Sequence, residues 1–160
     1  VGLVAIALAV GLLIAPLSSL ARKGDGFGRL ALKLAALAAG MIAYIVGHEA
    51  VHGVCMWMIS RVKPSFGITL MYAYAGSKVY FAKRAYVLIA LMPVAVWTAL
   101  LGGLCLAVPA DWFWVIWLVQ CMNVSGAAGD FYVAFRIGRM PQELLVQDSG
   151  TAMSVYVRAA

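Results

Sequence analysis

The sequence predicts an all-α membrane protein with four transmembrane helices and a short β-hairpin between the second and third helices. Apolar residues make up 65% of the 160 residues, charged residues only 11%, and the mean hydropathy is +0.97. These values are far from those of a soluble domain. A helix needs about 20 largely apolar residues to span a bilayer. Four segments have this length, namely residues 1–21, 34–60, 86–110 and 112–137.

We expect one integral membrane domain over residues 1–160, with a polar tail at 138–160. The basic residues Arg22 and Lys23 follow the first apolar segment instead of preceding it. This order favours a span over a cleaved signal peptide. The net charge of +6 is spread over loops and helix ends, which predicts a lipid bilayer and not nucleic acid as the partner.

The link between the second and third spans has a strand-like pattern. Gly76-Ser77 separates two runs of aromatic and β-branched residues, which is typical of a β-hairpin with its turn at this pair. An amphipathic interfacial loop is the alternative. A further terminal strand is expected at 155–157. Alternate positions of the first run are Phe66, Ile68, Leu70, Tyr72 and Tyr74.

The only two histidines, His48 and His52, lie within the second apolar segment. Four residues apart on an α-helix, their imidazoles share one face and can bind one metal ion. Glu49 follows the first histidine, where a general base for a metal-activated water is needed. An ionised or metal-binding group costs roughly 2.5–3.5 kcal/mol at bilayer depth, which indicates a functional site.

Catalytic zinc usually has three protein ligands, so a third is needed. The second and fourth spans run in the same direction. His52 lies nine residues before Arg61, or about 13 Å, and Asp130 lies six residues before Arg136, or about 9 Å. Asp130 is therefore at a similar depth near the same membrane face. The other candidates lie at the opposite face, in the tail or deeper in the span: Asp25, Asp111, Glu143, Asp148 and Cys121.

The residues around Asp130 support this choice. Gly126 and Gly129 precede it and weaken the helix, which permits a close approach of the backbone. A bent helix at membrane depth is tolerated where it faces protein or a wet cavity. The alternative is a carboxylate at a helix end, paired with Arg136 or Lys83.

The order HEAVHG, hairpin, helix and then NVSGAAGD resembles a family of small putative zincin peptidases over roughly Leu30–Tyr156. It is also similar to the three-helix core of site-2-protease-type intramembrane metalloproteases. The resemblance implies zinc held by the histidine pair and Asp130, water activated by Glu49, and substrate positioned by Asn123. The usual site-2 protease pattern has a nearby proline and an Asp-Gly pair, whereas here Phe131 follows Asp130.

The leading hypothesis is a membrane-embedded zinc metalloprotease that cleaves membrane proteins or peptides. The alternative is a metal-binding membrane protein without catalytic activity, with a regulatory or chaperone-like role. Glu49 argues against this alternative, because a structural zinc site closes its coordination shell and needs no base. A third interpretation is a pair of histidines that serves helix packing alone.

Substrate contacts are predicted in two places. An extended substrate needs partners for its backbone groups, and a sheet edge supplies them. We expect pairing along Ile68, Leu70, Tyr72 and Tyr74. Asn123 lies seven residues before Asp130, about 10 Å deeper on a straight helix. An interhelical hydrogen bond is the alternative role for Asn123.

Loop charges predict the orientation in a bacterial cell membrane. The face with the hairpin and tail has eight basic residues and the opposite face has four, which places the active-site half toward the cytoplasm. The compact basic cluster of the first loop argues for the reverse orientation in the membrane. The eight are Arg61, Lys63, Lys78, Lys83, Arg84, Arg136, Arg139 and Arg158, and the four are Arg22, Lys23, Arg29 and Lys33.

Overall fold

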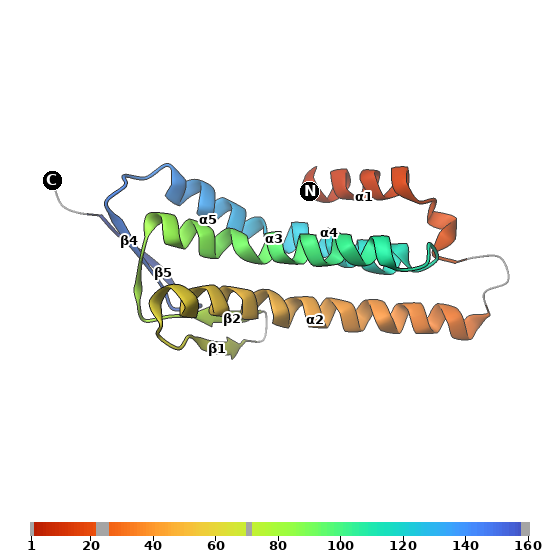
Figure 1. The fold of residues 1–160 in the computed structure, drawn as a ribbon, viewed down its shortest axis with the longest axis horizontal. Coiled ribbons are helices and arrows are strands. Elements are labelled where there is room, and N and C mark those ends of the chain that lie inside the picture. The colour runs from red at the N-terminus through yellow and green to blue at the C-terminus, as the bar shows by residue number, and fades with distance from the viewer. Residues whose placement is uncertain (1, 22–25, 70–71, 158–160) are drawn as a thin grey trace. The chain divides into compact units, whose positions relative to one another are not determined.

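The computed structural model describes residues 2–21, 26–69 and 72–157, and the chain divides into two compact units. The helical unit comprises Val1–Tyr44 and Val96–Ala127. The histidine unit comprises Ile45–Ala95 and Ala128–Ala160. Figure 1 shows the order of the elements along the chain.

Two helices contribute residues to both units. These are α2 (Phe27–Ser60) and α3 (Lys83–Ala107), and both are long and apolar enough to cross a membrane. They correspond to the spans predicted at 34–60 and 86–110, but each begins before the predicted residue. The helical part of the fold class is thereby confirmed for these two segments.

The other two predicted spans are divided into shorter elements. The first contains α1 (Gly2–Ile14) and a 3-10 turn (Leu17–Ser19). The last contains α4 (Phe113–Gly126) and α5 (Ala128–Gly138), with Ala127 between them. Pro16 separates the first pair, because proline cannot continue the hydrogen bonding of the preceding helix. The described residues thus do not bear out four continuous spans.

The helical unit is held together by tryptophans that reach backbone carbonyls. Trp114 Nε1 donates to Pro16 O at 3.1 Å, and Trp117 Nε1 donates to Ala7 O at 2.9 Å. A Cβ atom at Gly11 would lie 2.3 Å from Trp117 Nε1. Glycine at this position therefore allows α1 to approach α4 closely.

The predicted hairpin is present, but its turn lies elsewhere. Strand β1 (Ser65–Ile68) pairs with β2 (Ala73–Gly76) in antiparallel register. Thr69 N–H donates to Tyr72 O at 2.8 Å, which closes the hairpin before β2. The predicted turn at Gly76-Ser77 was wrong, and Leu70 lies outside the described residues. Figure 1 shows the hairpin beside the C-terminal part of α2.

A second antiparallel sheet joins the chain after Gly76 to the tail. Strand β3 (Tyr80–Ala82) pairs with β4 (Leu144–Asp148), which pairs with β5 (Met153–Val157). The expected strand at 155–157 is confirmed within β5. The tail is therefore not only polar, because β4 alternates buried and exposed residues.

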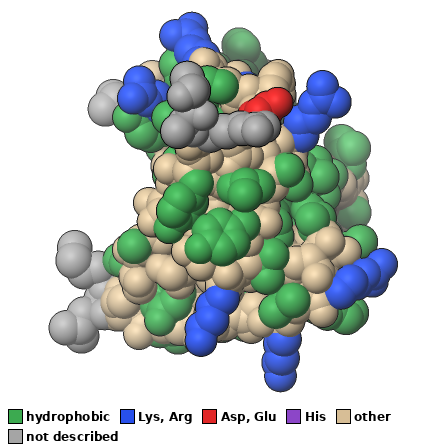
Figure 2. All heavy atoms as spheres, turned by 90° about the vertical axis from the view of Figure 1, so that its left-hand side faces the viewer, with side chains coloured by type: hydrophobic (Ala, Val, Ile, Leu, Met, Phe, Trp, Pro, Cys, Tyr) green, Lys and Arg blue, Asp and Glu red, His purple; other side chains and the backbone are tan. Residues whose placement is uncertain are grey.

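Lys and Arg side chains project from the margin of the face in Figure 2, with apolar side chains between them.

Candidate metal centre

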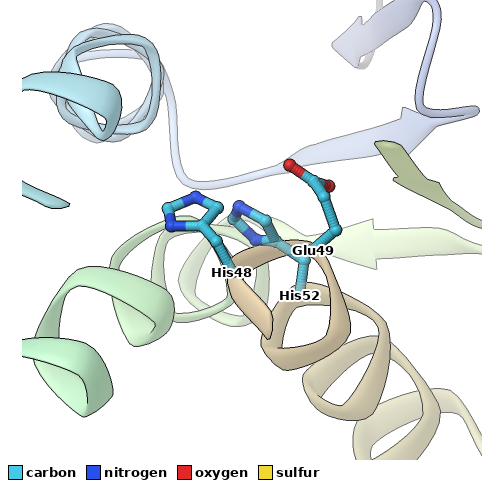
Figure 3. A group of neighbouring side chains, drawn as sticks. All are labelled: His48, Glu49 and His52. Atoms are coloured by element: carbon cyan, nitrogen blue, oxygen red, sulfur yellow. The ribbon is translucent and has the colours of Figure 1, made fainter. Parts of the chain in front are cut away.

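His48 and His52 project from the same face of α2, as their four-residue spacing requires. Their ring centroids are 5.0 Å apart and the ring planes are 76° apart. Figure 3 shows both rings on one side of the helix with the Glu49 carboxylate next to them. One ligand atom from each of these three residues lies within 4.8 Å of the others.

Asp130 completes the cluster from α5. Its Oδ2 lies 3.1 Å from His48 Nε2, and its Oδ1 lies 3.4 Å from His52 Nε2. Asp130 is in the first turn of α5, where the helix dipole favours a carboxylate. The alternative partner Lys83 donates to Met140 O at 2.6 Å. Asp130 thus lies next to both histidines, as expected from the similar depth of His52 and Asp130 along their predicted spans.

Glu49 is held by the hairpin. Its Oε2 accepts the Ala75 N–H of β2 at 2.9 Å. This bond points away from β1, so Phe66 and Ala75 form a non-hydrogen-bonded pair of the ladder. By the same alternation, the backbone groups of Ala73 face the Glu49 edge of β2.

The second ring nitrogen of His52 also has a partner. Nδ1 lies 3.1 Å from the carbonyl oxygen of Ile89 in α3. A carbonyl oxygen only accepts, so Nδ1 donates in this bond, and in the neutral ring Nε2 then has the lone pair that a metal ion requires. Metal-binding histidines almost always donate their other N–H in this way. No side-chain pattern in the sequence indicates this backbone carbonyl.

A cavity of about 260 Å³ adjoins the cluster, and residues from helices and strands line it. They include Glu49, His52 and Asp130, together with Tyr86 and Asp148. Tyr86 OH donates to Asp148 Oδ2, and Gly150 N–H donates to Asp148 Oδ1 at 2.8 Å. The sequence placed Asp148 in the tail. The structure instead places it in the cavity wall, because β4 pairs with β3.

Two glycines bring the turn after β4 onto β2. A Cβ atom at Gly76 would lie 2.2 Å from the carbonyl carbon of Ser149. Gly150 has a φ of +85°, and a Cβ atom there would lie 2.2 Å from Tyr74 Cδ2. Gly76 therefore serves this close approach and not a hairpin turn.

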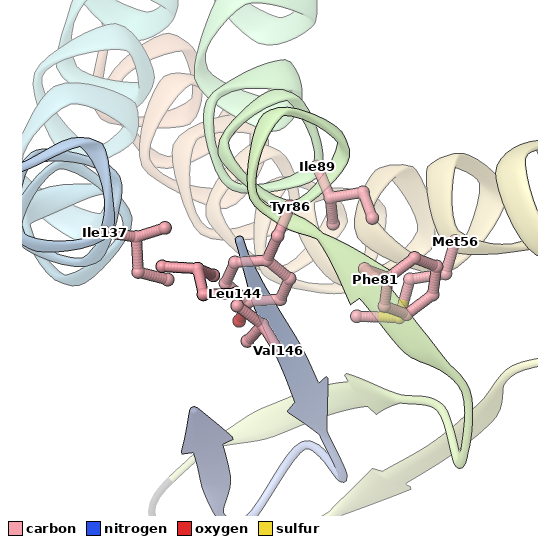
Figure 4. Close-up of a cluster of buried hydrophobic side chains, with 7 residues drawn as sticks. All are labelled: Met56, Phe81, Tyr86, Ile89, Ile137, Leu144 and Val146. Atoms are coloured by element: carbon pink, nitrogen blue, oxygen red, sulfur yellow. The ribbon is translucent and has the colours of Figure 1, made fainter. Parts of the chain in front are cut away.

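A cluster of buried apolar side chains fixes the elements around the cavity. Figure 4 shows them converging from α2, α3, α5, β3 and β4. Burying such side chains contributes roughly 1.5–3 kcal/mol each, which holds the elements that carry the polar groups. The cluster consists of Met56, Phe81, Tyr86, Ile89, Ile137, Leu144 and Val146.

The donor set fits zinc. In a tetrahedral site with ligand bonds of about 2.0–2.2 Å, two ligand atoms lie about 3.3–3.6 Å apart. The two contacts between histidine Nε2 and Asp130 oxygen, at 3.1 and 3.4 Å, are close to this spacing. Two imidazoles and one carboxylate are also a usual ligand set of catalytic zinc.

Asn123 belongs to the helical unit. Its side chain is fully buried, and Nδ2 donates to Thr98 Oγ1 at 3.0 Å and to Gln120 Oε1 at 3.3 Å. The bond to Thr98 joins α4 to α3, as the alternative role required. A role in substrate positioning stays a prediction.

The comparison with protein families agrees with this geometry. A family described as putative zincin peptidase matches residues 41–145, which include the histidine pair and Asp130. The chain belongs to this family. No curated protein and no solved structure matches it. The family supports a metallopeptidase with zinc as its metal, and His48, Glu49 and His52 supply a site of the HExxH type.

Proposed function

We propose that this zincin-family chain is a membrane-embedded zinc metallopeptidase that hydrolyses peptide bonds of membrane or membrane-proximal proteins. One observation carries the proposal. His48, His52 and Asp130 converge at 3.1 and 3.4 Å, beside a cavity that Glu49 also lines. In this proposal the two Nε2 atoms and the Asp130 carboxylate hold the metal.

Zinc bound by these residues would lower the pKa of a water molecule toward about 7 and polarise the scissile carbonyl. Glu49 would accept the water proton as the oxygen attacks the carbonyl carbon, and would deliver it to the leaving amine as the C–N bond breaks. Because Oε2 is bonded to Ala75 N–H, we assign the proton transfer to Oε1. The strand thereby orients the base.

The proposed location in a membrane rests on the length and apolar composition of the helices. Among the described helices, only α2 and α3 are long and apolar enough to cross a membrane. His52 lies eight residues before the end of α2, about 12 Å along its axis. We propose that residues 1–21 and 112–137 also cross the bilayer as interrupted segments. The excess of basic residues at the hairpin and tail supports an active-site half that faces the cytoplasm of a bacterial cell. Labelling single cysteines in these loops from either side would test the orientation.

A substrate would pair with β2, on the edge next to Glu49. The sequence predicted pairing along Ile68, Leu70, Tyr72 and Tyr74, of which Leu70 lies outside the described residues. The hydrogen bond from Ala75 N–H to Glu49 supports pairing at the Ala73 end of β2. The 260 Å³ cavity is lined by Tyr72, Ala73, Tyr74 and Ala75 together with Glu49, and by no residue of β1. A bound strand would lie in this cavity between the edge of β2 and the metal ligands.

The catalytic assignment is tested with Glu49→Gln. We expect the wild type and Glu49→Gln to bind one zinc per chain, with cleavage lost in the variant, because an amide cannot accept the proton. His48→Ala, as a control, should lose zinc and cleavage together. Cleavage at the wild-type rate in Glu49→Gln contradicts the assignment. Zinc binding without cleavage of any membrane substrate by the wild type favours the non-catalytic alternative.

The proposed pairing of substrate with the edge of β2 is tested by substitution with proline, which removes a backbone donor and is tolerated at sheet edges. Ala73→Pro acts on the edge next to Glu49, and Ile68→Pro acts on the opposite edge of the hairpin, because the two residues form a non-hydrogen-bonded pair. We expect Ala73→Pro to reduce cleavage with zinc still bound, and Ile68→Pro to leave both unchanged. Equal cleavage by the two variants contradicts pairing at β2.

A further inference from the structure

The carbonyl oxygen that accepts the His52 N–H belongs to a helix that contains a proline. In an uninterrupted α-helix, the oxygen of Ile89 would accept the N–H of the residue four positions later. That residue is Pro93, inside α3. Proline has no N–H, and its ring crowds the carbonyl four residues before it. Ile89 O therefore lacks the donor that any other residue at position 93 would supply.

Burial makes the replacement donor important. Ile89 is 1% exposed, and Pro93 is also fully buried. Carbonyls freed by proline in apolar helices are satisfied by neighbouring groups. Here the neighbouring group is His52, whose Nδ1 lies 3.1 Å from Ile89 O. With the proton at Nδ1, the lone pair is at Nε2, which lies 3.4 Å from Asp130 Oδ1.

We propose that Pro93 is a positioning residue of the metal centre. Because it supplies no N–H to Ile89, it leaves this carbonyl to His52 Nδ1 and so fixes the His52 tautomer whose Nε2 faces the metal. The role toward zinc rests on the proposed function, whereas the hydrogen bond between His52 Nδ1 and Ile89 O is present in the metal-free chain. Loss of such a hydrogen bond to a metal-binding histidine typically lowers metal affinity 10–100-fold.

A purely structural proline predicts a different result. If Pro93 served only helix shape or packing, its replacement would change stability without a specific effect on His52. In our proposal, Pro93→Ala restores a helical N–H that competes for Ile89 O. The helix then gains a hydrogen bond while His52 loses its partner. Helix stability and metal affinity should change in opposite directions.

The first experiment reads the tautomer directly in the metal-free protein. Nitrogen-15 NMR of the two imidazoles at alkaline pH, with His48→Gln for assignment, should show the proton of His52 on Nδ1 in Asp130→Ala protein, where no carboxylate competes for a proton at Nε2. When Pro93→Ala is added to this protein, we expect a mixture of the two tautomers. An unchanged Nδ1–H signal after this addition overturns the proposal. This readout holds even if the wild type binds no zinc, an outcome that would count against the proposed function alone.

The second experiment measures zinc affinity by competition with a chelator, together with the midpoint of thermal unfolding. Pro93→Ala should bind zinc 10–100-fold more weakly, with an equal or higher midpoint. Pro93→Leu restores the same N–H and keeps apolar volume at this buried position, so it should show the same loss. Pro141→Ala, at an exposed loop residue, should change neither quantity. Wild-type affinity in either folded Pro93 variant overturns the proposal.

Discussion

The two units bury polar side chains in different ways. In the helical unit, Lys33 is 1% exposed, donates to Leu20 O at 3.0 Å and lies 3.7 Å from an Asp111 oxygen. Asn123 and Thr98 bond to each other at 3.0 Å. These groups are partners of one another or of the backbone, so their bonds serve the packing of the helices.

In the histidine unit the polar groups converge on a cavity. The Nε2 atoms of His48 and His52 both face Asp130, while Glu49 is fixed from the side by a strand. The rule that a buried ionisable group in an apolar helix is functional applies to both units equally. A group of ligand atoms that converges beside a cavity is what distinguishes a candidate reaction site from polar groups that serve helix packing.

The strongest test of this difference compares the same substitution in each unit. We expect Asp130→Ala to lower zinc affinity by more than the roughly 10–100-fold that loss of an outer hydrogen bond costs, because a direct ligand is removed. Asp111→Ala should leave affinity unchanged. Chelator competition on both purified proteins measures this. Wild-type zinc content in Asp130→Ala would remove Asp130 from the ligand set.

The second test concerns stability in the helical unit. Asp111→Ala removes the carboxylate that lies 3.7 Å from the buried Lys33 ammonium, and also breaks the 3.2 Å contact of Arg29 with Asp111. Breaking a buried pair costs about 3–5 kcal/mol, which denaturant unfolding in detergent would detect. The paired replacement of Lys33 by Met and Asp111 by Leu should recover much of the loss. A loss below about 1 kcal/mol in Asp111→Ala would show that solvent or lipid headgroups reach Lys33.

Residue spacing was enough to predict that His48, His52 and Asp130 lie close together. The four-residue separation placed His48 and His52 on one face, and the depth argument selected Asp130 from five acidic residues and Cys121. Both predictions depend on helix geometry, which is nearly independent of context. The same reasoning predicted α2 and α3 but not the interruption at Ala127, although the flanking Gly126 and Gly129 were recognised as weak points.

Backbone partners and long-range strand pairing were not predictable in this way. The Ala75 N–H and the Ile89 carbonyl are present in any sequence, so no residue type marks them. Asp148 was excluded as a tail residue because nothing local indicates that β4 pairs with β3, more than 60 residues earlier. Gly76 was assigned to a turn because glycine is common in turns. Glycine also allows close backbone approach, and the sequence alone does not distinguish these two uses.

The smallest effect is expected for Asn123, and it tests whether the helical unit takes part in the chemistry. Asn123→Ala removes the bond to Thr98 between α4 and α3, and such bonds in membranes are worth about 0.6 kcal/mol. We expect a loss of unfolding free energy of that order. Thr98→Ala removes the same bond, and a bond from Gln120 Nε2 to Thr98 Oγ1, but leaves Asn123 in place. It therefore separates loss of the interhelical bond from loss of the Asn123 side chain. If Asn123 positions substrate, turnover per folded molecule will fall in Asn123→Ala and not in Thr98→Ala. Equal turnover in both variants would leave Asn123 with the packing role that its bonds describe.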